Sequence, residues 1–179
     1  MNRSTLVKEE IEVPKGVTAE LKDNRLTIKG AKGTLRREFA HPLVRMTQEK
    51  GKIAVQSRMA GRREKALVGT WAAHVRNMIR GVNEPFRYTM KAVYAHFPVK
   101  ISVKGNELVI ENFLGEHHPR RAPLLGDTKV TVKGQELELV GISLEDVGQT
   151  AANIENATRV RNRDPRVFQD GIFITSKGE

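Results

Sequence analysis

The sequence predicts an α+β protein made of two tandem, duplicated domains, each with a small, mainly antiparallel β-sheet and one long helix packed on it. Three observations support this prediction. The sequence repeats itself, each copy shows the same alternation of apolar residues, and a segment with helical periodicity closes each copy. With 179 residues, the chain is long enough for one domain or two small ones.

The internal repeat is the most informative feature of the chain. A shift of 82 positions aligns six identical pairs within seventeen positions: Val17 with Val99, Lys22 with Lys104, Asn24 with Asn106, Leu26 with Leu108, Ile28 with Ile110, and Gly33 with Gly115. Further along, a shift of 79 aligns residues 69–75 with residues 148–154. Because the order of the matching residues is kept, we interpret the chain as a tandem duplication of one unit.

Alternating apolar residues around turn residues predict two strand pairs in each copy. In the first copy, the pairs span residues 17–30, with a turn at Asp23-Asn24, and residues 44–55, with a turn at Lys50-Gly51. In the second copy, they span residues 99–110 and 130–139, with turns at Gly105-Asn106 and Gly134-Gln135. Each copy is therefore expected to contain at least four short strands.

A helix is predicted at the end of each copy, because apolar residues there recur every three or four positions. The first runs from about Arg62 to Arg80, and the second begins after Ser143, which is suited to cap it. Gly69 and Gly148 hold matching places inside these helices, where glycine costs about 1 kcal/mol relative to alanine. We expect close approach of each helix to its sheet to compensate for this cost.

The boundary between the copies is predicted at residues 81–85, where the first helix must stop before Pro85. Residues 1–82 are then an N-terminal repeat domain, and residues 83–179 are a C-terminal repeat domain with a basic C-terminal extension. A strand-like segment, residues 86–97, opens the second domain.

Composition favours an anionic partner. The formal net charge is +10, and residues 1–90 hold 19 basic and 9 acidic side chains, whereas residues 91–179 hold 12 of each. The absence of cysteine excludes disulfides and thiolate chemistry. No apolar run is long enough for a membrane span or a signal peptide, so we expect a soluble, intracellular protein without a membrane partner.

The sequence offers little that would support catalysis or metal binding. Its five histidines are scattered, apart from the adjacent pair His117-His118, and none forms a ligand spacing such as HExxH. Nucleotide-binding and nucleophile-elbow motifs are also missing. We therefore predict no enzyme activity, no metal and no cofactor.

Basic clusters are the candidate contacts to an anion. Arg159, Arg161 and Arg163 are spaced by two, so an extended segment would place all three on one side, where guanidinium groups can bind phosphates. Arg120-Arg121 is predicted in a loop that projects toward the partner. Arg62-Arg63 opens the first helix, where basic charge is unfavourable with the helix dipole, and a plain solvated turn is an equal alternative there.

Aromatic residues are few, which favours recognition of backbone and shape over base stacking. Trp71, Phe113 and Phe173 fall at apolar positions of their patterns and are expected in the core. Tyr88, Tyr94 and Phe168 are the candidates for exceptions.

Four strings resemble the universal family of large-subunit ribosomal protein six, and most closely its archaeal and eukaryotic branch. Residues 68–82 are similar to that branch's first helix, and residues 106–116 to its second hairpin. Residues 147–155 are similar to its second helix, and residues 163–172 to its C-terminal signature, although Asn156 stands where glutamine is usual. The resemblance covers nearly the whole chain in order.

This resemblance implies a structural constituent of the large subunit of the cytoplasmic ribosome. Such a protein binds large-subunit ribosomal RNA near the sarcin–ricin loop and the base of the stalk, mostly through its second domain. Neighbouring ribosomal proteins and translation factors are implied nearby. The residues predicted to contact RNA are Arg159, Arg161, Arg163, Arg166, Arg120, Arg121, His117, His118, Lys177, Arg62 and Arg63.

Two other function classes remain open at the level of sequence. One is a free-standing regulator that binds a structured RNA, or a partner protein through its sheet edges. The other is an RNA-modifying or hydrolytic enzyme, which is the weakest of the three.

Overall fold

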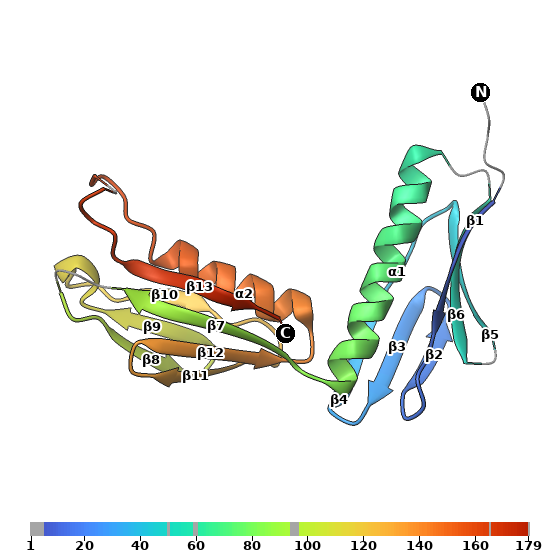
Figure 1. Cartoon of the computed structure of the whole chain (residues 1–179), viewed down its shortest axis with the longest axis horizontal. Helices are drawn as coiled ribbons and strands as arrows, with labels where there is room; N and C mark the ends of the chain where they lie inside the picture. Colours follow the sequence, from blue (N-terminus) through green and yellow to red (C-terminus); the bar gives the residue numbers. More distant parts are fainter. Residues whose placement is uncertain (1–5, 50, 59–60, 94–96, 165, 179) are drawn as a thin grey trace. The chain divides into compact units, whose positions relative to one another are not determined.

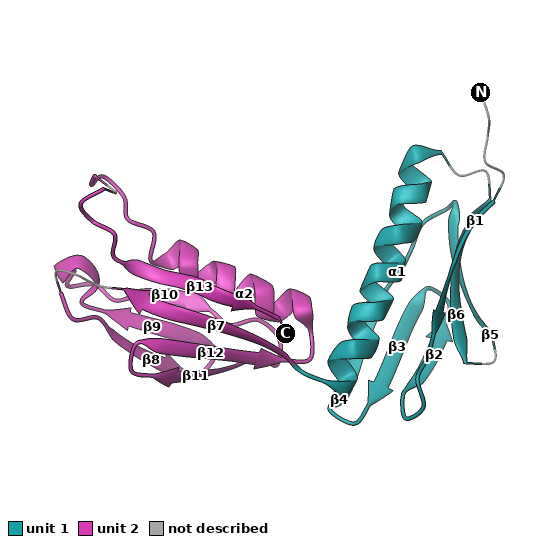
Figure 2. Ribbon diagram, in the orientation of Figure 1, with its two compact units in different colours: residues 1–85 teal, residues 86–179 magenta. Residues whose placement is uncertain are grey.

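The chain divides into two units, residues 1–85 and residues 86–179 (Figure 2). The computed structural model describes residues 6–49, 51–58, 61–93, 97–164 and 166–178 (Figure 1). Lys50 of one predicted turn, Tyr94 and His96 lie outside the described residues.

Unit 1 pairs six strands into two antiparallel sheets, in the orders β1-β6-β5 and β2-β3-β4, beside one helix (Figure 1). The elements are β1 (Leu6–Glu12), β2 (Thr18–Lys22), β3 (Arg25–Gly30), β4 (Gly33–Glu38), β5 (Val44–Glu49), β6 (Lys52–Arg58) and α1 (Arg62–Asn83). The helix ends just before Pro85, where the backbone N–H of Glu84 donates to the Arg80 carbonyl (2.8 Å). Both predicted strand pairs and the first helix are present.

Unit 2 repeats this plan with two antiparallel sheets, in the orders β10-β9-β8 and β11-β12-β7-β13, and one helix. The elements are β7 (Phe86–Val93), β8 (Lys100–Lys104), β9 (Glu107–Glu111), the 3-10 turn η1 (Phe113–Gly115), β10 (Arg120–Pro123), β11 (Lys129–Lys133), β12 (Glu136–Gly141), α2 (Leu144–Ala157) and β13 (Gly171–Lys177). As predicted, the Ser143 hydroxyl caps α2 by accepting from the Asp146 N–H (3.3 Å). The predicted α+β class is confirmed, with the strands of each unit divided between two sheets.

The repeated residues occupy equivalent places in the two units. Leu26 in β3 and Leu108 in β9 are both fully buried in their cores. The carbonyls of the repeated turn residues also act alike: Asn24 accepts from the Phe39 N–H (2.7 Å), and Asn106 accepts from the Leu124 N–H (2.8 Å). The duplication therefore preserves both core positions and turn hydrogen bonds.

Within the described residues, β13 and the segment that leads to it have no counterpart in unit 1. Strand β7 pairs with β12 as β1 pairs with β6, and β13 adds to the free edge of β7. Residues 159–170, which we call the arginine loop, connect the end of α2 to β13. The predicted basic C-terminal extension is thus a loop followed by an additional edge strand.

The interpretation of the helical glycines was wrong. A Cβ added at Gly148 would meet the Tyr88 hydroxyl at 3.6 Å, and one at Gly69 would meet only a Glu9 carboxylate oxygen at 3.9 Å. Both are ordinary contacts, so neither helix needs glycine to approach its sheet. Close helix–strand contacts lie instead at two strand glycines, where a Cβ at Gly30 would meet Val82 at 2.7 Å and one at Gly141 would meet Val147 at 2.6 Å.

One aromatic residue expected in the core is exposed. Phe173 keeps 43% of its surface accessible, whereas Trp71 and Phe113 are buried as predicted. Because side chains alternate along a strand, Ile172 on β13 faces the core and its neighbour Phe173 faces the opposite side. Three consecutive apolar residues in a strand cannot all be buried on one face.

Candidate nucleic-acid interface

Two basic stretches that lie about forty positions apart in the sequence meet at the end of α2. A hollow of about 370 Å³ is lined by Arg120, Arg121, Asn156, Ala157, Arg159 and Arg161. We call the exposed arginines of this hollow, Arg121, Arg159 and Arg161, the arginine surface. Its guanidinium groups are suited to phosphate oxygens, because each can donate two parallel hydrogen bonds.

Arg120 and Arg121 lie in strand β10, not in a loop as predicted. They pair with Ile110 and Val109 of β9. Because neighbours in a strand point to opposite faces, the two arginines have different surroundings. The Arg121 side chain is 66% exposed and has a loose ion pair with Glu107 (3.6 Å), whereas the Arg120 side chain is only 22% exposed.

The arginine loop is fixed at its base by a buried threonine. The Thr158 hydroxyl donates to the Ile154 or Glu155 carbonyl and accepts from the Ile172 N–H of β13 (3.0 Å). The end of α2 and the start of β13 are therefore joined directly below the loop. Arg159, Arg161, Arg163 and Arg166 are all exposed above this joint.

The loop is not extended throughout, so its arginines do not share one side as predicted. Asn162 adopts a left-handed conformation (φ 58°), which turns the chain between Arg161 and Arg163. The Arg163 guanidinium lies over the Phe168 ring, 4.7 Å from its centroid. Arg159 and Arg163 also border a second, more apolar hollow of about 870 Å³ that includes Phe168 and Phe173.

The other residues predicted to contact RNA do not line this hollow. Lys177 lies at the end of β13 opposite the arginine loop, six residues or about 20 Å along the strand from Gly171. His117 and His118 are exposed between η1 and β10. Arg166 is exposed, and its backbone N–H donates to the Asp164 carboxylate (2.9 Å). Arg62 and Arg63 belong to unit 1, where they open α1 without a side-chain cap.

Sequence reasoning missed Glu116, which holds the Arg120 guanidinium. The Arg120 Nε–H donates to one Glu116 carboxylate oxygen (2.8 Å), and an Nη2–H donates to the other (2.5 Å). This pair lowers the pKa of the Glu116 carboxyl below its ordinary value, and Arg163 adds a smaller effect in the same direction. The spacing of an acid four residues before Arg120 was the available signal.

The lowered pKa of Glu116 predicts an acid-sensitive contribution to the stability of unit 2. Its stabilising effect is complete above the ordinary glutamate pKa of about 4.3 and is lost as the pH falls through the lower folded-state value. We expect Glu116→Gln to be less stable than the natural protein at pH 7 and to lose less stability on acidification. Thermal unfolding of both proteins at several pH values between about 7 and 3 measures this, and parallel curves would contradict it.

Neither helix of the described residues is long and apolar enough to span a membrane. Within the described parts of the chain, no three histidine, aspartate or glutamate side chains are grouped so that they could hold a metal ion.

Exposed arginines that cluster on one part of a surface, as at the end of α2, are typical of proteins that bind polyanions. The sequence matches the model of one family, Ribosomal protein L6, in two segments, residues 13–84 and 97–171. The chain therefore belongs to the ribosomal protein L6 family, whose members are structural, non-enzymatic components of the ribosome. The two matched segments correspond to the two copies of the repeat.

Several archaeal proteins are similar over nearly their whole length. The large ribosomal subunit protein uL6 of Methanocella arvoryzae is 53% identical over 169 residues, which cover 94% of this chain and 96% of that protein. The proteins of the same name from Methanosarcina mazei (49% identical, 93% and 95% covered) and Methanobrevibacter smithii (47% identical, 96% of each covered) are also similar. The resemblance to this family is confirmed.

Proposed function

We propose that this chain is a constituent of the large ribosomal subunit that binds its ribosomal RNA through the arginine surface of unit 2. The main support for this proposal is that β10, the end of α2 and the arginine loop bring Arg121, Arg159 and Arg161 to one hollow. All three side chains are exposed, so their donors can reach phosphates without first breaking a buried contact. The protein works in the cytoplasm, on the ribosome, with ribosomal RNA and ribosomal proteins as its partners.

The RNA we propose is the region that carries the sarcin–ricin loop, close to the base of the stalk. There the chain supports the surface on which translation factors bind, together with neighbouring ribosomal proteins. This placement comes from the family resemblance. The chemistry of the arginine surface supports contact with phosphates, which position a protein on RNA without reading its sequence.

Replacing Arg121, Arg159 and Arg161 by alanine tests the proposal. Each lost phosphate contact is expected to lower the salt dependence of the affinity, so the slope of log affinity against log salt should fall by about 2 in total. The probe is an RNA fragment that carries the sarcin–ricin region, titrated with the full chain at several salt concentrations. Circular dichroism checks that the variant is folded.

A matched control removes the same charge elsewhere on unit 2. Lys100, Lys104 and Lys129 are exposed on β8 and β11, and none of them lines the hollow. Their triple alanine variant should lose much less affinity than the arginine variant. Equal losses would mean that only net charge matters, and an unchanged arginine variant would reject this surface as the RNA contact.

Two experiments extend the test to the ribosome. The chain should sediment with large subunits that have been washed in salt, whereas a free regulator would stay in the supernatant. Crosslinks to the RNA should map to the arginine loop and β10. Crosslinks confined to unit 1 would reject the proposed interface.

A further inference from the structure

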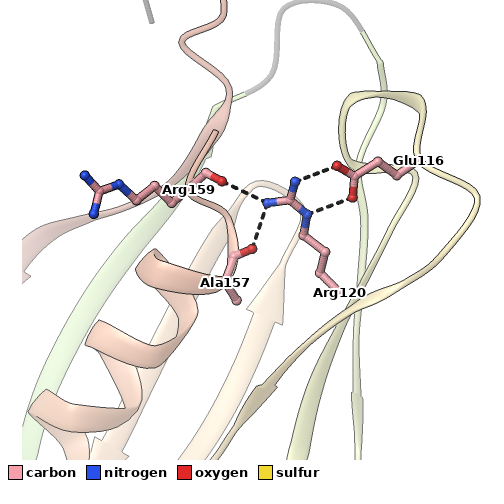
Figure 3. A network of polar contacts seen from close by, with 4 residues as sticks. All are labelled: Glu116, Arg120, Ala157 and Arg159. Carbon is pink, nitrogen blue, oxygen red and sulfur yellow. Dashed lines mark hydrogen bonds and ion pairs between the residues drawn. The ribbon is translucent and has the colours of Figure 1, made fainter. Parts of the chain in front are cut away.

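Arg120 lines the same hollow as the arginine surface, but its guanidinium group is bound within the protein (Figure 3). In addition to its two bonds to Glu116, its Nη1 donates to the carbonyls of Ala157 (2.9 Å) and Arg159 (3.0 Å). Four of the five N–H donors of a guanidinium are thus in use. One face of the group also covers the buried Phe113 ring, 4.4 Å from its centroid.

These contacts join two segments that are distant in the sequence, residues 116–120 and residues 157–159. Glu116 belongs to the connection before β10, Ala157 is the last residue of α2, and Arg159 is the first residue of the arginine loop. The helix has no basic residue in its own last turn, so Arg120 of β10 supplies the positive charge that its carbonyl end favours. The contact to the Arg159 carbonyl fixes the backbone from which the Arg159 side chain projects.

We propose that Arg120 is a positioning residue for RNA binding and does not itself contact phosphate. It holds the start of the arginine loop in place, so that Arg159 and Arg161 need not be ordered when RNA binds. This inference rests on the proposed function. The guanidinium is too fully engaged to offer a phosphate the two parallel donors that make arginine a strong phosphate ligand.

The two possible roles of Arg120 predict opposite effects when Glu116 is neutralised. If Arg120 contacted phosphate, Glu116→Gln would release it and remove a repulsive charge, so the RNA would bind more tightly. If Arg120 positions the loop, Glu116→Gln weakens the clamp, so the RNA binds more weakly. We expect a loss of about 5- to 30-fold, the cost of ordering one backbone residue on binding.

Glu107→Gln is the matched control, because it makes the same charge change on neighbouring strand β9. Glu107 is paired loosely with Arg121 (3.6 Å), which belongs to the arginine surface. Its neutralisation releases Arg121, so affinity should stay the same or rise. Tighter binding by both variants would overturn the positioning role of Arg120.

Arg120→Lys separates charge from geometry. A lysine keeps the positive charge, but its compact ammonium cannot hold a carboxylate and two carbonyls in one plane. We expect this variant to bind the RNA fragment about as weakly as Glu116→Gln, with an unchanged salt slope because no phosphate contact is lost. The proposal would be overturned if Arg120→Lys bound the RNA fragment as tightly as the natural chain. It would also be overturned if Arg120→Ala lowered the slope of log affinity against log salt by about 0.7 to 0.9.

A readout without RNA keeps this inference distinct from the proposed function. Backbone amide hydrogen exchange around residues 157–163 should be faster in Arg120→Lys and Glu116→Gln than in the natural chain, with the rest of unit 2 unchanged. If the triple arginine variant binds RNA normally, the proposed interface fails. If that variant loses binding while exchange near Arg159 is unaltered in Arg120→Lys, only the positioning role fails.

Discussion

Phe113→Ala is expected to lower the free energy of unfolding of unit 2 by about 3–5 kcal/mol. Phe113 is 1% exposed and is among the largest fully buried side chains of the protein. Its removal leaves a cavity below Arg120 and deletes the ring on which that guanidinium rests. The flanking residues Asn112 and Leu114 both have positive φ (60° and 53°), so packing of Phe113 must also hold a strained turn in place.

Thermal and denaturant unfolding followed by circular dichroism measures this loss. Phe97→Ala is the control, because it removes the same ring from a site that is 43% exposed. The only tryptophan of the sequence, Trp71, lies in unit 1, so its fluorescence follows that unit in the same sample. A loss below about 1 kcal/mol in Phe113→Ala, or an equal loss in Phe97→Ala, would contradict the prediction.

Elements with a clear apolar period could be predicted from the sequence. The predicted hairpins appear as β2-β3, β5-β6, β8-β9 and β11-β12, because one buried face per strand imposes a period of two. Both helices follow from a period of 3.6, and the cap at Ser143 and the stop before Pro85 follow from local backbone chemistry. The repeat supported these assignments independently, since the strands and the helix predicted in one copy were also predicted at the matching positions of the other.

Strand β10 could not be predicted, because it carries almost no apolar signal. Among its four residues, only Ala122 belongs to the core, and two arginines precede it. Its strand conformation depends on pairing with β9, which is a tertiary contact. For the same reason, the sequence could not show that Arg120 faces inward and Arg121 faces solvent.

The candidate site was predicted in its composition but not in its geometry. Residues 120–121 and 159–161 line one hollow, although they lie about forty positions apart in the sequence. The left-handed turn at Asn162 and the stacking of Arg163 on Phe168 were not foreseeable from a spacing of two. Lys177 is separated from the site by the length of β13, which only the sheet register shows.

The close helix–sheet approach expected at the helical glycines occurs instead at a strand glycine, Gly30 at the end of β3. Its position there leaves room for the end of α1, since an added Cβ would lie 2.7 Å from the Val82 side chain and 2.8 Å from the Val82 carbonyl oxygen. That carbonyl accepts from the Lys32 N–H (3.0 Å), which ties the β3–β4 turn to the helix. Val82 is fully buried in the core of unit 1, so its displacement would disturb the side chains packed around it.

Gly30→Ala is therefore expected to destabilise unit 1 by about 1–3 kcal/mol through overpacking. Displacement of the Val82 carbonyl would break its bond to Lys32 and add about 1 kcal/mol. Denaturant unfolding monitored by Trp71 fluorescence measures the effect, because Trp71 packs edge-on against Phe39 in this core (centroids 5.2 Å apart) and becomes exposed on unfolding.

Gly69→Ala gives the matched comparison within the same unit. Gly69 lies inside α1 with no neighbour closer than 3.9 Å to an added Cβ, so the better helix propensity of alanine should stabilise the unit by up to about 1 kcal/mol. The same substitution is thus expected to have opposite signs at the two positions, because one glycine is required by packing and the other is merely tolerated. Destabilisation at Gly69 together with a neutral change at Gly30 would show that the helix, and not the strand, needs its glycine.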